Sequence, residues 1–139
     1  MADHITEAKG AIVAALKADA TVTALVPATR IYNVEAPATP VWPWILVGSP
    51  TESPDNYTCI DGSLLSIAVH GFAKGPGELS TATIANAIKR ALDGKTYSRL
   101  AGTVAVDLTH QQTQIIRDSA EASAYHSISR FEVAVAEYA

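Results

Sequence analysis

The chain has 139 residues, of which 48% are hydrophobic and 17% charged, and its formal net charge is −4. This length suits one ordinary domain whose core needs no disulfide. The apolar content excludes a disordered chain, and the negative net charge argues against a general nucleic-acid-binding face. No stretch approaches the ~18 apolar residues of a membrane span, and the first residues lack the pattern of a signal peptide. The single cysteine, Cys59, can form no internal disulfide. We expect one soluble domain over residues 1–139, made and kept inside a cell, with a charge-poor surface typical of assemblies.

The first predicted element is an amphipathic helix. Apolar residues recur three or four positions apart, as on one helix face: Ile5, Ala8, Ile12, Val13 and Leu16. Glu7, Lys9 and Lys17 are expected to lie off that stripe. Asp19 is expected to cap a short second helix that ends before Pro27.

Extended segments follow the two helices. Residues 30–34 favour a strand, and residues 41–48 (VWPWILVG) predict another, whose proline places its start at a sheet edge or at the entry to the strand. Two prolines mark residues 49–56 as a loop, and Asp61-Gly62 indicates a turn. Residues 64–72 carry apolar side chains on both faces, so we expect both faces of that strand to be at least partly covered.

The second half of the chain begins with its best predicted helix. The buried stripe of that helix consists of Ile84, Ile88, Ala91 and Leu92. Lys89 and Arg90 suit the negative end of its dipole, and Gly94 is the expected stop. Residues 104–108 and 125–138 predict strands, with 111–117 as a segment that pairs with the first of them. The order indicates an α+β fold, a mainly antiparallel sheet packed against an N-terminal helix and one long central helix.

No motif in the sequence predicts catalysis. The four histidines, His4, His70, His110 and His126, are far apart and lack metal-ligand spacing. Asp107 and His110 are residue types of a hydrolase triad, but no G-x-S-x-G turn presents a nucleophile. The glycine-rich segment 71–77 resembles a phosphate loop only weakly, because no Ser or Thr follows its lysine, and a strand-to-helix turn is the simpler interpretation. We therefore expect no catalytic residue, no cofactor and no metal.

Candidate contact residues come from aromatic spacing and from charge. Trp42 and Trp44 point to the same side of a strand, as a core or subunit-contact pair. Residues 31–73 contain four acidic and no basic residues, whereas residues 74–99 contain five basic and two acidic ones, a net +3. Separated acidic and basic regions allow copies to pack head to tail, although accidental clustering on a solvated face explains the pattern equally well. The candidate subunit or partner contacts are Glu52, Asp55, Lys89, Arg90, Trp42 and Trp44.

Several segments together resemble the tail-completion, or tail terminator, proteins of long-tailed bacteriophages, prophages and gene transfer agents. The resemblance lies in their order and spacing: residues 11–19 (AIVAALKAD) followed by Leu25-Val26, then Arg30-Ile31-Tyr32, Ala36-Pro37, residues 43–48 (PWILVG), the strand 64–72 leading into 87–92 (AIKRAL), and 125–133 (YHSISRFEV). The chain departs from the family pattern at Trp42-Pro43-Trp44, which is bulkier than usual, and at residues 118–124, which lack a tight Asp-Gly turn.

The resemblance implies a structural protein of the virion. Such proteins form a ring, usually of six copies, at the head-proximal end of the tail tube, where the ring stops tube growth and offers the surface to which the filled head docks. The implied partners are further copies of the chain, the tail tube protein and a head–tail connector, and DNA passes through the lumen without being read. An acidic chain suits such a conduit, because a strongly basic lumen would hold DNA by counterion release. A connector, a tube subunit and a small cytoplasmic enzyme remain the alternative functions.

Overall fold

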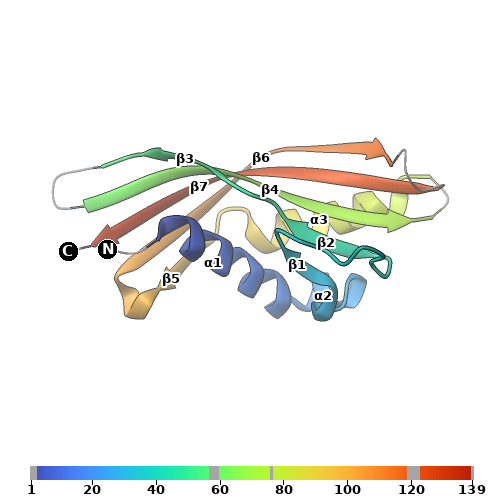
Figure 1. Ribbon diagram of the computed structural model, residues 1–139, viewed down its shortest axis with the longest axis horizontal. Helices are drawn as coiled ribbons and strands as arrows, with labels where there is room; N and C mark the ends of the chain where they lie inside the picture. Colours follow the sequence, from blue (N-terminus) through green and yellow to red (C-terminus); the bar gives the residue numbers. More distant parts are fainter. Residues whose placement is uncertain (1–2, 57–59, 76, 119–122, 139) are drawn as a thin grey trace.

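The structure is a computed structural model that describes residues 3–56, 60–75, 77–118 and 123–138. Helices pack against one face of a seven-stranded, twisted sheet (Figure 1). The helices are α1 (His4–Ala18), α2 (Ala20–Leu25) and α3 (Leu79–Leu92), with short 3-10 turns at Ala28–Arg30 and Leu100–Gly102. The strands are β1 (Ile31–Asn33), β2 (Trp44–Val47), β3 (Thr51–Pro54), β4 (Ile60–Lys74), β5 (Thr96–Arg99), β6 (Val104–Arg117) and β7 (Ala124–Tyr138). Among the described residues, no helix is long and apolar enough to cross a membrane.

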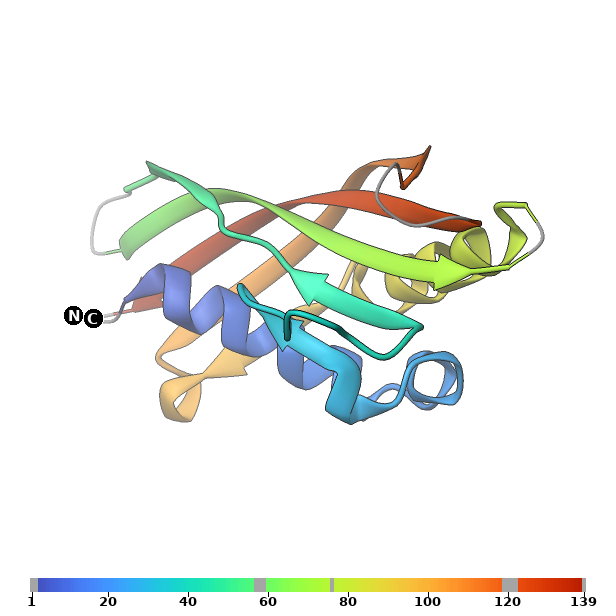
Figure 2. The same cartoon turned by 45° about the vertical axis from the view of Figure 1, so that its right-hand side comes forward.

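The sheet is mainly antiparallel, which confirms the predicted α+β class. Its strand order is β1-β2-β4-β7-β6-β5, and β3 pairs with β4 beyond the end of β2. Only β1 and β2 run parallel among the described pairs. The centre is the pair β4–β7, whose register runs from Ile60↔Tyr138 to Lys74↔Ala124, so two strands of 15 residues pair over their whole length. Figure 2 shows the helices lying along one side of these long strands.

The helices begin and end at the residues that the sequence indicates. The Asp19 side chain accepts a hydrogen bond from the Val22 N–H at 2.9 Å, as an N-cap does, and Gly94 follows α3 with a φ of +72°, which favours glycine. The prediction that Lys9 lies off the apolar stripe was wrong, since this side chain is buried. Position 9 is one turn after Ile5 and one turn before Ile12 and Val13, so the helical period places it on the apolar stripe, and burial lowers the pKa of its ammonium group.

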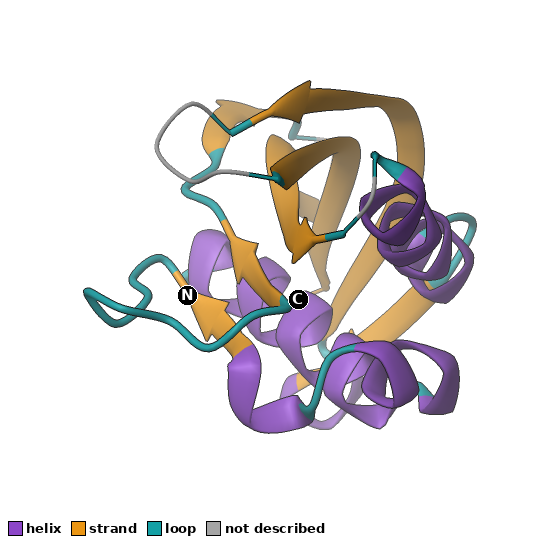
Figure 3. Cartoon of the chain, turned by 90° about the vertical axis from the view of Figure 1, so that its right-hand side faces the viewer, coloured by secondary structure: helices purple, strands orange, loops and turns teal. Residues whose placement is uncertain are grey.

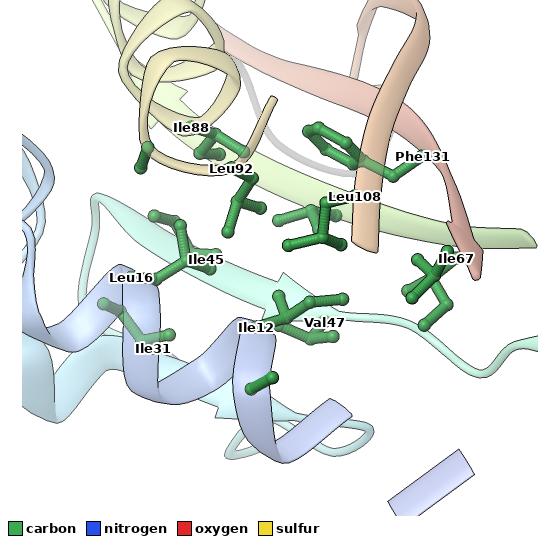
Figure 4. Packing of buried hydrophobic residues seen from close by; sticks show 14 of the residues in the cluster. Ile12, Leu16, Ile31, Ile45, Val47, Ile67, Ile88, Leu92, Leu108 and Phe131 are labelled. Atoms are coloured by element: carbon green, nitrogen blue, oxygen red, sulfur yellow. The ribbon is translucent and has the colours of Figure 1, made fainter. Parts of the chain in front are cut away.

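The core fills the space between the helices and the inner face of the sheet (Figure 4). Every second residue of β4 and β7 points inward, as strand periodicity requires, so Leu65, Ile67 and Val69 meet Phe131 and Val133 there. The other face of β4 carries partly exposed side chains at Leu64, Ala68, His70 and Phe72. Partial covering of both faces of this strand is therefore confirmed.

Three local predictions about the strands need correction, and one strand was not predicted. Residues 51–54, expected as a loop, form the edge strand β3, and Asp61-Gly62, expected as a turn, lies within β4. Glycine is required at position 62 because a Cβ atom there would collide with the backbone carbonyl oxygen of Asp55. Residues 111–117 continue β6 past a bulge instead of pairing with it, and β5 was not predicted. The departure expected at 118–124 falls largely on residues outside those described. Cys59 and Pro76, the proline of the glycine-rich segment 71–77, also lie outside them.

Candidate functional site

An aromatic row crosses the outer face of the sheet, which is the face away from the helices. Trp44, Phe72 and His126 are cross-strand neighbours on β2, β4 and β7. The Trp44 and Phe72 rings stack with centroids 3.8 Å apart, and Phe72 and His126 stack at 4.2 Å. Trp42 meets Trp44 edge-on at 5.9 Å and carries the Lys74 ammonium 5.1 Å from its ring centroid. The two tryptophan rings are therefore in contact, but Trp42 lies in a bend before β2 and not on the predicted strand. Their role in subunit contacts remains a prediction.

A histidine pair lies at the edge of this aromatic row. His70 Nδ1 and His126 Nε2 are 2.7 Å apart, a distance that requires one ring nitrogen to donate a proton and the other to accept it. Burial first and the adjacent His70 second lower the pKa of His126, Asp118 partly opposes them, and the net result is a pKa of about 4. Burial also lowers the pKa of His70, with a contribution from Arg130. Both imidazoles are neutral at pH 7, which allows the pair to persist in the sheet.

This pair predicts acid sensitivity. Because the folded state resists protonation of His126 down to about pH 4 while the unfolded chain accepts a proton near pH 6.5, stability is lost as the pH falls through that interval. After a discount for solvent screening at a half-buried site, we expect the free energy of unfolding to fall by on the order of 2 kcal/mol. Urea denaturation at steps from pH 7 to pH 4 measures the free energy of unfolding as a function of pH. In His126→Gln, the free energy of unfolding should change less between pH 6.5 and 5 than it does in the wild type. The same pH dependence in both proteins would contradict the assignment of the acid sensitivity to His126.

The acidic candidates lie at the end of the sheet near the chain termini. Glu52 is exposed on β3, and Asp55 is half-buried just after it, where its N–H donates to the Gly62 carbonyl oxygen at 3.0 Å. Glu52 lines a polar hollow of about 330 Å³. The other described residues of the lining are Asp3, His4, Pro54, Asn56, Asp61, Gly62 and Ser63. Sequence reasoning missed this grouping, since residues near position 3 meet residues near 55 and 62 only through the tertiary fold.

The basic candidates lie on a different element. Lys89 and Arg90 are exposed in the last turn of α3 and line a shallow hollow of about 250 Å³ with Asn86 and Asp93. Neither forms an ion pair with a carboxylate in the described part of the chain. The acidic candidates lie on or just after β3 and the basic ones on α3, so the two sets belong to different elements of the fold.

An apolar groove adds a surface that the sequence did not reveal. It lies where β4 leads into α3, at the end of the molecule that faces the viewer in Figure 3, and has a volume of about 490 Å³. Its described lining is Leu25, Trp42, Pro43, Ala73, Lys74, Leu79, Ser80, Thr83 and Ile84. Leu79 is 75% exposed at its rim, which is unusual for a leucine on a helix that is otherwise well packed.

The triad residues do not form a relay in the described structure. The His110 ring hydrogen-bonds to Thr113 Oγ1 at 2.7 Å, and Asp107 accepts a hydrogen bond from the Thr96 hydroxyl. The segment considered as a phosphate loop begins inside β4, with Gly71 at a cross-strand position opposite Ser127. Residues 71–74 belong to β4, and the Gly75 N–H donates to the Ser123 carbonyl oxygen at 3.1 Å.

The fold and these surfaces define a class of protein. An α+β chain with aromatic, apolar and charged surfaces of this kind has the features of a structural assembly protein. The family of tail completion protein gp17 matches residues 10–136. The chain therefore belongs to the tail completion protein gp17 family, whose members are structural proteins of the phage tail, and its place is in the virion.

A comparison with solved structures agrees with the fold. A chain of the virion of a native gene transfer agent particle superposes with a TM-score of 0.76, at 20% sequence identity, over 97% of this chain and 99% of that one. At this identity the match shows that the two chains share a fold. No curated protein sequence matches this chain.

Proposed function

We propose that this protein forms a ring, of six copies by expectation, at the head-proximal end of the tail tube, where it ends tube growth and provides the surface to which the head docks. Membership of the tail completion family over residues 10–136 carries the proposal. In this role the chain acts as one domain, binds further copies of itself, the tail tube protein and a head–tail connector, and has no enzymatic activity.

The surfaces of the chain support a ring. A closed ring is built from heterologous contacts, in which two different patches of one chain meet. The acidic end with Glu52 and Asp55 and the basic end of α3 with Lys89 and Arg90 offer two patches of opposite charge on separate elements. The open edge of β3, whose four residues are all exposed, offers backbone groups for pairing with a neighbour. DNA would pass through the lumen without base-specific contacts, which agrees with the net charge of −4.

Electron microscopy of assembled particles tests the proposal. We expect a label on this protein to appear once per tail, at the junction between tube and head, and we expect tails made without the protein to vary in length and to remain unattached to heads. A label distributed along the tube would instead indicate a tube subunit. A label that stays with isolated heads would indicate a connector.

A further inference from the structure

A second polar cluster closes the inner face of the sheet near the chain termini. It consists of His4, Asp61, Ser63 and Glu137, and we call it the His4 cluster. Asp61 and Glu137 are directly opposite each other in the antiparallel pair β4–β7, and Ser63 is the next inward-facing residue of β4. His4, the first residue of α1, packs over them, with its side chain only 5% exposed, compared with 20% for Glu137 and 38% for Asp61.

The donor atoms of this cluster converge. His4 Nε2 is 3.1 Å from Glu137 Oε1 and 3.9 Å from Asp61 Oδ2, and one ligand atom of each of the three residues lies within 4.8 Å of the other two. In a tetrahedral centre with bonds of about 2.0–2.2 Å, neighbouring ligand atoms are about 3.3 Å apart. The two distances from His4 Nε2 bracket that spacing, so small side-chain shifts suffice to form a metal site.

The fourth member of the cluster holds the imidazole. His4 Nδ1 is 2.6 Å from Ser63 Oγ. When the Nδ1–H donates to this hydroxyl, the lone pair remains on Nε2, which faces both carboxylates. A hydrogen bond at the second ring nitrogen fixes the tautomer and the orientation of histidine ligands in this way. Ser63 is therefore a positioning residue.

The electrostatics favour a cation at this place. Two carboxylates directly opposite each other on paired strands repel, which destabilises the pair. The adjoining hollow adds Asp3 and Glu52, and its described lining contains no lysine or arginine. A divalent ion between the two carboxylates removes the repulsion, and the hollow gives it access to solvent for its remaining ligand.

We propose that the His4 cluster binds a divalent transition-metal ion, with Zn²⁺ as the representative, through His4 Nε2 and the carboxylates of Asp61 and Glu137, and with water as the fourth ligand. A mixed nitrogen and oxygen donor set suits Zn²⁺, Co²⁺ or Ni²⁺, whereas Mg²⁺ and Ca²⁺ prefer oxygen ligands alone. Binding fastens the start of α1 to the ends of β4 and β7. The site is therefore structural, and it is independent of the proposed ring.

The competing arrangement is a protonated His4 that pairs with both carboxylates and takes no metal. Tag-free protein with its native N-terminus, dialysed against a chelator and then freed of it, is titrated with ZnCl₂ in a calorimeter. We expect one saturable equivalent, a rise in the melting temperature with added Zn²⁺, and no saturable binding of MgCl₂. With Co²⁺, the absorption of a four-coordinate site gives a direct spectroscopic readout. Absence of a saturable Zn²⁺ equivalent, or uptake of several weak equivalents, would overturn the proposal.

Variants then locate the site. Ser63→Ala should weaken Zn²⁺ binding about 10–100-fold, as loss of an orienting hydrogen bond does, while leaving the number of equivalents at one. His4→Gln should weaken it at least as much. His126→Gln is the matched control, since it removes a histidine from the His70–His126 pair and should leave the affinity unchanged. Circular dichroism with chelator present verifies that each variant is folded. Unchanged affinity in His4→Gln, or lost affinity in His126→Gln, would place the metal elsewhere and refute the assignment.

Discussion

Phe131→Ala is expected to lower the free energy of unfolding by about 3–5 kcal/mol. Phe131 is fully buried and is the largest such side chain among the described residues. It lies near the middle of β7, opposite Ile67 on β4 and His110 on β6, and the edge of the His110 ring meets it with centroids 5.4 Å apart. Figure 4 shows Phe131 among the buried residues of the core. Because β7 is paired with a strand on each side, these strands cannot move into the space that the removed ring leaves, and a cavity remains.

Urea denaturation monitored by circular dichroism measures this effect at pH 7, where the histidine pair is neutral. The matched control is Tyr138→Ala, which removes an exposed aromatic ring from the end of the same strand. We expect the control to change the free energy of unfolding by less than about 0.5 kcal/mol. Similar losses in the two variants would mean that Phe131 does not hold the sheet to the helices.

Local periodicity predicted those parts of the fold that are fixed by burial. The buried residues of β7 alternate with half-buried or exposed ones, and the apolar stripe of α3 recurs at helical spacing, so the hydrophobic pattern alone identifies both elements. β3 has no such signal, because all four of its residues are exposed and it is a strand only through pairing with β4. The predicted turn at Asp61-Gly62 was wrong for a related reason. The glycine is needed there because the backbone of Asp55 approaches it closely, and not because the chain turns.

The candidate site was predictable only where its residues are neighbours in sequence. Trp42 and Trp44 are two positions apart, so their proximity could be predicted from the sequence, although Trp42 lies in a bend before β2 and not on the strand. Phe72 and His126 complete the aromatic row through the long register of β4 with β7, and His4 meets Glu137 across 133 positions. Such contacts depend on strand order and on how α1 closes over the sheet, which no local pattern encodes.

Reversing the charge at the basic end of α3 is expected to weaken assembly more than any other surface change. Lys89→Glu combined with Arg90→Glu converts two cations into two anions on an exposed helix turn. If these side chains face the acidic patch of a neighbouring copy, each attraction of roughly 0.2–1 kcal/mol becomes a repulsion of similar size. The total is on the order of 2 kcal/mol, which is about a 30-fold weaker association. Incorporation of the variant into particles, measured by quantitative mass spectrometry in competition with wild type, gives this ratio.

Salt dependence separates an ion-paired interface from a general defect. Added salt screens exposed charges, so raising the ionic strength from about 0.05 M to about 0.5 M should weaken wild-type incorporation and narrow its advantage over the double variant. Both substitutions also oppose the helix dipole, at a cost of about 0.3–1 kcal/mol each. Lys17→Glu, in the last turn of α1, imposes the same kind of dipole cost outside the predicted contact and should be incorporated normally. Equal incorporation of the double variant and wild type at low salt would exclude Lys89 and Arg90 from the interface, and the charge separation along the chain would then be a property of its solvated surface.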